Sequence, residues 1–287
     1  MNFNKDTKIL IIGLGVIGGG YAAALSEAGY HVKCITKEAH DVDYALERGM
    51  IEYGATEVKE ELVRDADLII FALYPTVFID WIEKHGHLMS RGTLITDVTG
   101  VKSSVVSRVQ NMLPEGIEFI SAHPMAGRER SGVEFSDAKV FKGANFIITP
   151  TEKNTKESIE IAKRLGEVLG FAKISTLTVE EHDRMIAFLS QLTHCIAVTL
   201  MTCNDTPNLE KYTGDSFRDL TRIAKINDRM WSELFIMNKD ALICEMDKFI
   251  KEFQDFKELI EKEDAEAMRK KMRSSTERRS LFDKPTP

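Results

Sequence analysis

Two short stretches carry side chains that could move a proton and hold an anion. The first, SAHPMAGRERSG, begins at Ser121 and places His123 directly before a proline. A residue before proline is biased toward extended backbone, so the imidazole of His123 stays out of a following helix and is available as a general base. The second, GDSFRDLTRIAK, begins at Gly214 and spaces Arg218 and Arg222 four residues apart on a predicted helix. Two guanidinium groups among apolar residues suit a ligand that bears carboxylates.

Each stretch also has a simpler interpretation. His123 could be a turn histidine held by a local hydrogen bond. The arginine helix could be a solvated charged face, in which Asp219 pairs with Arg222 three residues later. The place of each stretch in the fold distinguishes its functional interpretation from the simpler one.

A glycine loop near the N-terminus predicts a dinucleotide site. The stretch KILIIGLGVIGGG places the pattern Gly-x-Gly-x-x-Gly directly after a predicted strand and at the start of a predicted helix. In that context the three glycines allow a tight turn, close approach to a pyrophosphate, and strand–helix packing. The residues expected to bind the cofactor here are Gly13, Leu14, Gly15, Val16, Ile17 and Gly18, with Leu73 at the end of a later predicted strand.

The end of the second predicted strand favours NADP over NAD. An acidic residue at this place would bind the ribose 2′-hydroxyl of NAD. The sequence GYHVKCITKEAH instead places Thr36 there, followed by Lys37, although Glu38 is close. A hydroxyl and a cation can accommodate a 2′-phosphate, so Thr36 and Lys37 are predicted to contact it.

The elements that position these residues alternate in the first half of the chain. Short apolar runs predict strands at residues 8–12, 31–35, 67–73, 93–97, 118–122, 145–149 and 173–176. Helical patterns lie between them, among others at 18–28, 42–48, 102–112 and 156–169. This alternation predicts a Rossmann-type α/β domain with a doubly wound parallel sheet over residues 1–177. His123 then follows a strand at the carboxyl edge of the sheet, where this fold binds its ligands.

The second half carries helical patterns without a strand signal. Thr178 and Glu181 have the spacing of a capping box, and Met185, Phe188 and Leu192 begin an apolar stripe behind it. Both faces of this helix have the pattern of partly buried surfaces, and one small domain can rarely cover both. We therefore expect an all-helical substrate and dimerisation domain over residues 178–287, and a homodimer.

The net charge, the apolar runs and the cysteine spacing exclude several classes of protein. The chain has 287 residues and a net charge of −7, which argues against a nucleic-acid partner. No leader peptide and no run of about 20 apolar residues is evident, so we expect a cytoplasmic protein without a membrane partner. The four cysteines lack metal-site or disulfide spacing, and neither a metal nor a disulfide is expected.

Three motifs in this order and spacing, GLGVIGG, HPMAGRERSG and GDSFRDLTRIA, resemble the prephenate/arogenate dehydrogenase family of tyrosine biosynthesis. The resemblance extends to about residue 280, and we expect neither a fused mutase segment nor a regulatory domain. It implies a Rossmann-type domain with a helical dimerisation domain. The implied reaction is oxidative decarboxylation of prephenate to 4-hydroxyphenylpyruvate, or of arogenate to tyrosine.

The resemblance also assigns roles. It makes His123 the catalytic histidine that hydrogen-bonds the ring hydroxyl, and Arg222 the arginine that holds the ring carboxylate. Glu129 matches an acid in a gating ionic network, although Arg128 stands where a small or polar residue is usual. Further positions placed in or beside the substrate site are Gln191, His194, Arg218, Asp219 and Trp231.

One departure concerns the support of His123. The family commonly has a serine before Val-Lys in a D-x-x-S-V-K loop, but this chain reads DVTGVK, with Gly100 in that place. Thr99, Ser103 or water is expected to supply the missing hydroxyl, unless nothing does.

Two rival functions use a similar fold. One is a nucleotide-sensing regulator, which would not need both the histidine and the paired arginines. The other is a β-hydroxyacid dehydrogenase or imino-acid reductase. Those enzymes usually carry a proton-donating lysine on the first helix of the second domain, and TVEEHDRMIAFLSQLTH contains none. Prephenate is favoured over arogenate on family prevalence, not on any residue.

Overall fold

A computed structural model of the chain describes residues 3–127, 130 and 132–283. Six parallel strands form the main sheet in the order β3-β2-β1-β4-β5-β6, the strand order of a dinucleotide-binding fold. The strands are β1 (Ile9–Ile12), β2 (Val32–Ile35), β3 (Tyr53–Ala55), β4 (Leu68–Phe71), β5 (Leu94–Asp97) and β6 (Glu118–Phe119). The predicted Rossmann-type sheet is confirmed, and β3 is a strand beyond those predicted.

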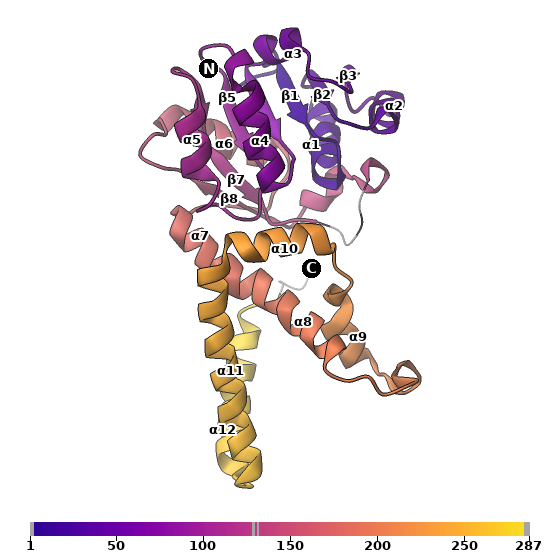
Figure 1. Ribbon diagram of the computed structural model, residues 1–287, viewed down its shortest axis with the longest axis vertical. Helices are drawn as coiled ribbons and strands as arrows, with labels where there is room; N and C mark the ends of the chain where they lie inside the picture. Colours follow the sequence, from indigo (N-terminus) through magenta and orange to yellow (C-terminus); the bar gives the residue numbers. More distant parts are fainter. Residues whose placement is uncertain (1–2, 128–129, 131, 284–287) are drawn as a thin grey trace. The chain divides into compact units, whose positions relative to one another are not determined.

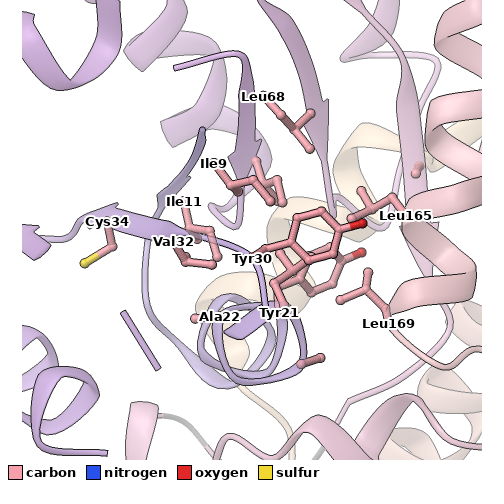
Figure 2. Close-up of a cluster of buried hydrophobic side chains, with 14 of the residues drawn as sticks. Ile9, Ile11, Tyr21, Ala22, Tyr30, Val32, Cys34, Leu68, Leu165 and Leu169 are labelled. Carbon is pink, nitrogen blue, oxygen red and sulfur yellow. The ribbon is translucent and has the colours of Figure 1, made fainter. Parts of the chain in front are cut away.

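Helices cover both faces of this sheet because alternate strand residues point to opposite sides (Figure 1). One face packs against α1 (Val16–Glu27), α2 (Ala39–Glu47) and α6 (Lys156–Val168). The other packs against α3 (Glu60–Asp65), α4 (Pro75–His85) and α5 (Val106–Met112). Figure 2 shows the first of these layers, in which Tyr21 of α1 and Leu165 of α6 lie near Ile9 of β1. Both faces are buried, which explains why the strands are continuous apolar runs.

The predicted strand at residues 118–122 is split in two. β6 ends at Phe119, and β7 (Ser121–Pro124) belongs to a second sheet with β8 (Asn145–Thr149) and β9 (Lys173–Thr176). β7 runs antiparallel to β8, with His123 opposite Ile147. His123 therefore lies inside an edge strand of this small sheet and not beyond the end of a main-sheet strand, which corrects the predicted position.

The helical part begins with a long helix that changes winding midway. α7 (Val179–Ile186) starts at the predicted capping box, with Thr178 and Glu181 bonding each other's backbone. A π-helical turn, η4 (Ala187–Leu192), joins it to α8 (Thr193–Thr202). π-turns occur frequently at functional sites. After the 3₁₀ turn η5 (Leu209–Tyr212) follow α9 (Asp215–Thr221), the 3₁₀ turn η6 (Arg222–Ala224) and α10 (Asp228–Met237).

Residues Val179–Thr202 are long and apolar enough to cross a membrane by length and composition, contrary to the expectation that no stretch approaches this. The same helix, however, carries the polar residues His182, Asp183 and Gln191, all buried within the protein. Its exposed apolar side chains include Met185, Phe188 and Leu189. A helix with this pattern fits a surface that another protein chain covers.

The chain divides into two compact units, residues 1–239 and 240–287. The first unit includes α7 to α10 because these helices bond to the α/β part and to one another; for example, the Ser104 hydroxyl donates to the Met237 carbonyl of α10. The predicted domain boundary at residues 177/178 stays a prediction. The second unit is a hairpin of α11 (Lys239–Glu261) and α12 (Ala265–Ser280), crossed by the ion pair Lys271–Glu252.

Candidate active site

The turn between β1 and α1 has the shape of a pyrophosphate cradle. Gly13 has a φ of +95°, and a Cβ there would lie 2.6 Å from the Ala72 carbonyl oxygen. A Cβ on Gly18 would lie 2.1 Å from the Gly13 oxygen, so both positions require glycine. Around Gly15, by contrast, nothing in the described part of the chain lies within 4 Å of a Cβ position. That open space at a helix N-terminus fits a pyrophosphate group.

The other predicted cofactor residues surround this turn. Leu14 is buried, whereas Val16 and Ile17 are partly exposed at the start of α1. Leu73 lies just beyond β4, and its Cδ2 is 2.9 Å from where a Cβ on Gly13 would lie. Thr36 lies directly after β2, where its backbone N–H donates to the Ala55 carbonyl, and Lys37 is exposed beside it. These residues therefore line the same sheet edge, at the point where the strand order reverses between β1 and β4.

His123 is the first member of a chain of three polar side chains. Its Nδ1 lies 2.9 Å from Nε2 of His182, and Nδ1 of His182 lies 2.7 Å from the Asp183 carboxylate. The carboxylate also accepts the backbone N–H groups of Lys102, at 2.9 Å, and Ser103, at 2.8 Å. His182 and Asp183 come from the first turns of α7, so the helical part of the chain supports the histidine of β7.

Burial and neighbouring charges set the protonation of this chain. Burial lowers the pKa of His123 well below its ordinary value, and His182 and Lys102 lower it further. Burial also lowers the pKa of His182, although Asp183 opposes the shift. For Asp183, burial raises the pKa but the bonds from His182 and Ser103 outweigh it, so the pKa lies below its usual range. At neutral pH the site therefore holds two neutral imidazoles and one carboxylate.

These protonation states determine which ring nitrogens carry hydrogen. The Asp183 carboxylate only accepts, so the hydrogen of His182 is on Nδ1 and its Nε2 accepts. His123 must then donate from Nδ1, which leaves a lone pair on its own Nε2. A partly buried ring in this tautomer is oriented to take a proton from a substrate hydroxyl.

Gly100 lies beside the same ring. A Cβ on Gly100 would be 3.8 Å from Cε1 of His123 and 3.6 Å from the side chain of Leu234. Thr99, one of the predicted substitutes for the missing serine, instead bonds the Asp97 carboxylate, and Ser103 uses its backbone N–H on Asp183. The group that holds Nδ1 of His123 is His182.

His194 and Trp231 form a neighbouring aromatic wall. Their rings stack at 3.7 Å between centroids and 29° between planes. His194 Nδ1 donates to the Ser190 carbonyl at 2.8 Å. Trp231 is one turn from Leu234 on α10, and Leu234 borders Gly100. The stacked pair therefore lies near the His123 side of the site.

Gln191, a predicted substrate-site residue, is bonded to α10. It is buried, its Nε2 donates to the Leu234 carbonyl at 2.9 Å, and its Oε1 accepts from Asn238 at 2.8 Å. These bonds tie η4 to α10. Gln191 therefore supports the aromatic wall, and its predicted place beside the substrate stays a prediction.

The two arginines lie on an exposed part of the chain. α9 ends at Thr221, so Arg222 begins the 3₁₀ turn η6 and does not share one continuous helix with Arg218. Arg218 donates to Asp215 at 2.9 Å, one turn earlier, while Asp219 is exposed. Both α9 and η6 pack against α8, the helix that carries His194. Glu129, the predicted gating acid, lies outside the described residues.

Comparison with known proteins shows the family of the chain. The family profile described as "Prephenate dehydrogenase, nucleotide-binding domain" matches residues 21–175, and "Prephenate dehydrogenase, dimerization domain" matches residues 178–274. The chain belongs to the prephenate dehydrogenase family. It is 33% identical to the prephenate dehydrogenase of Bacillus subtilis over 93% of this chain and 73% of the relative. It is also 27% identical to the cyclohexadienyl dehydrogenase of Zymomonas mobilis over 94% of both chains.

A solved structure of the family superimposes on nearly the whole chain. Prephenate dehydrogenase from Aquifex aeolicus, in complex with hydroxyphenyl propionate and NAD+, has a TM-score of 0.90 and 29% sequence identity. The alignment covers 98% of this chain and 100% of that one. Membership of the prephenate dehydrogenase family makes the chain an NAD(P)-dependent oxidoreductase and removes the nucleotide-sensing and β-hydroxyacid or imino-acid alternatives as family assignments.

His182 and Asp183 are not among the site residues predicted from the sequence. In the sequence the two residues stand within a run of charged residues, from Glu180 to Arg184, at the capping box. In sequence they look like a solvated helix start. Their partners are about 60 and 80 residues away in the chain, so periodicity gives no sign of the contact.

Proposed function

We propose that this chain is a prephenate dehydrogenase, which oxidatively decarboxylates prephenate to 4-hydroxyphenylpyruvate. The observation that carries the proposal is the His123–His182–Asp183 chain, which leaves a lone pair on Nε2 of His123 in a domain that also holds a dinucleotide cradle. Family membership supplies the substrate class, and the site supplies the base that the reaction needs.

The proposed mechanism assigns one proton transfer to His123. A dinucleotide bound with its pyrophosphate at the glycine cradle would supply an oxidised nicotinamide, the hydride acceptor for the ring carbon that bears the hydroxyl. Nε2 of His123 takes the hydroxyl proton as that carbon is oxidised. The ring carboxylate leaves as carbon dioxide, its bonding electrons enter the ring, and His123 returns the proton to the phenolate oxygen. Hydride and carbon dioxide leave, and no net proton is released.

His182 and Asp183 are proposed to keep the base ready for this transfer. The imidazolium that forms on His123 donates from Nδ1 to His182, whose hydrogen is fixed by Asp183. The negative charge of Asp183, two hydrogen bonds away, favours the cation that develops. Preorganisation of this kind removes the need to rotate the ring or recruit water during the reaction.

Arg222 is proposed to hold the ring carboxylate. A guanidinium group binds a carboxylate through two parallel hydrogen bonds, and η6 packs against the helix of His194. Arg218, Asp219 and Trp231 are proposed to lie in or beside the substrate site, with Arg218 leaving its bond to Asp215 when an anion is bound. His194 and Trp231 offer a stacking surface for the substrate ring.

We also propose NADP as the preferred cofactor. The position after β2 that would carry an acid for the NAD ribose is Thr36, with the exposed cation Lys37 next to it. The runner-up substrate is arogenate, which differs at the side-chain amine and would use the same base.

Side-by-side assays test these assignments. Prephenate and arogenate are each incubated with NAD and with NADP, and the absorbance of the reduced cofactor gives kcat/KM for the four pairs. We expect the highest value for prephenate with NADP. A higher value for arogenate would replace the substrate, a strong NAD preference would overturn the role of Thr36 and Lys37, and no turnover with any pair would refute the function.

We further propose that the enzyme is a cytoplasmic homodimer. The dimerization-domain match covers residues 178–274, and Met185, Phe188 and Leu189 are exposed within it. Apolar side chains of this size on one helix favour a subunit interface. The four cysteines are free thiols, which suits a reducing compartment.

A further inference from the structure

A buried ion pair lies directly behind His123. Asp97 is the last residue of β5, Lys102 follows in the next loop, and both side chains are fully buried. Nζ of Lys102 lies 2.8 Å from Oδ2 of Asp97. Withdrawing two charges from water is costly, and an apolar pair of similar volume often gives equal or greater stability. Stability alone therefore does not explain why this ion pair is present.

The pair holds the strand of the base on both sides of one residue. The Ala122 N–H donates to Oδ1 of Asp97 at 3.1 Å, and the Ala122 carbonyl accepts from Nζ of Lys102 at 2.7 Å. Oδ1 also accepts the Ser121 hydroxyl at 2.7 Å. β7 is an edge strand, so these backbone groups point away from β8 and would otherwise have no ladder partner. Ala122 directly precedes His123.

Lys102 also reaches the far end of the histidine chain. While its side chain bonds the strand of His123, its backbone N–H donates to Oδ1 of Asp183. The Nζ donates to Asp97, Thr99 and Ala122, which uses all three hydrogens of an ammonium group. A single residue thus fixes the distance between the strand that carries the base and the carboxylate that orients it.

We propose that Asp97 and Lys102 are positioning residues for the reaction, which hold His123 in register with His182 and Asp183. This rests on the proposed role of His123 as the base. The pair also sets the local field. The ionisable side chains facing the His123 ring are His182 from α7 and Lys102 from the loop, with Asp97 and Asp183 behind them. Lys102 is one of the groups that lower the pKa of His123, after burial and His182.

The test compares a charge-neutral double variant with a matched pair on the surface. Asp97→Asn with Lys102→Met removes both charges together, so neither is left uncompensated. The control, Lys8→Met with Asp65→Asn, removes an exposed ion pair near the opposite end of the same sheet. For each protein we would measure kcat, KM, cofactor Kd, thermal unfolding and the pH profile of kcat/KM.

We expect kcat of the double variant to fall by about 100-fold, because the base is misplaced. Its cofactor Kd should stay within about threefold of wild type. The acid limb of its pH profile should move to higher pH because the cation next to His123 is gone. A folded double variant with the kcat and pH profile of the surface control would overturn the proposal.

A milder variant keeps the proposal testable if the double variant does not fold. Ser121→Ala removes one hydrogen bond to Asp97 and leaves both charges in place. A fall in kcat at unchanged melting temperature supports positioning, whereas wild-type kcat contradicts it. His123→Asn, assayed in parallel, separates a failure of the proposed base from a failure of the positioning proposal. If that variant stays active, the proposed base is wrong; if it is inactive while the double variant and Ser121→Ala are normal, only the positioning proposal fails.

Discussion

The two halves of the proposed active site are held in opposite ways. His123 is fixed through His182, Asp183 and a buried ion pair, all bonded to one another inside one unit of the chain. Arg218 and Arg222 lie on exposed turns, and Arg218 is held by a surface ion pair with Asp215. The base is thus preorganised before substrate arrives. The anion-binding arginines are exposed and take their final positions only when the ligand binds and, in the proposed dimer, when α9 has its neighbours in the assembly.

This contrast explains what each half can contribute. A fixed base lowers the barrier because no reorganisation is needed at the moment of reaction. An exposed arginine adds binding energy that is largely the same in substrate and transition state. Changes in the buried half should therefore reduce kcat, and changes in the exposed half should raise KM.

The largest effect is expected for His123→Asn. Loss of the general base should lower kcat by about 10²–10⁴-fold, with cofactor binding unchanged because the glycine cradle is intact. Stopped-flow or steady-state turnover, together with a cofactor titration, checks this. His87→Asn, at an exposed histidine, is the control. Turnover within about threefold of wild type would rule out His123 as the base.

Asp183→Asn should have the next largest effect, a fall in kcat of about 100-fold. An amide no longer forces the hydrogen of His182 onto Nδ1, so two ring N–H groups can face each other between His182 and His123. KM should change little. An Asp183→Asn enzyme with wild-type kcat would show that His123 does not depend on this chain.

The lowered pKa of Asp183 also predicts that the stability of the protein depends on pH. The folded-state pKa of Asp183 lies below its ordinary value, so the carboxylate stabilises the protein above about pH 4, the unfolded-state value, and loses this effect as pH falls further. The difference in melting temperature between wild type and Asp183→Asn should thus be full at pH 7 and shrink on acidification below about pH 4. A constant difference would contradict the lowered pKa.

Arg222→Ala should act on the other half. The loss of a charged hydrogen-bond partner for the ring carboxylate is expected to raise KM by about 10- to 100-fold while kcat falls much less. Arg229→Ala, on the exposed start of α10, provides a charge-matched control. An unchanged KM with a reduced kcat would move Arg222 from binding to chemistry and remove the contrast between the halves.

The smallest effect is expected for Gly100→Ser. The Cβ would meet Leu234 and His123 at ordinary contact distances of 3.6 and 3.8 Å, so the fold should tolerate it. Because His182 already orients His123, an added hydroxyl should change kcat by less than about threefold. A large gain in kcat would mean that the family's serine has a role that His182 does not replace here.

The sequence predicted the Rossmann sheet, the capping box and the glycine cradle because each depends on neighbouring residues. It could not show that the strand at residues 118–122 breaks at Ile120 and changes sheets, since both parts are apolar and buried. It marked Gln191 by its position on a helix face, but only the tertiary structure shows its amide bonded to α10. It did not indicate His182 and Asp183 because their contacts depend on the packing of distant segments.

The central claim is that His123 is a neutral imidazole with its hydrogen on Nδ1 and a lone pair on Nε2. Nitrogen-15 NMR of histidine-labelled enzyme measures this directly, with the His123 signals assigned by their loss in His123→Asn. At pH 6.5, about the ordinary histidine pKa, we expect a neutral ring in the Nδ1–H form because burial holds its pKa well below that value. A cationic ring, or a neutral ring protonated on Nε2, would contradict the claim.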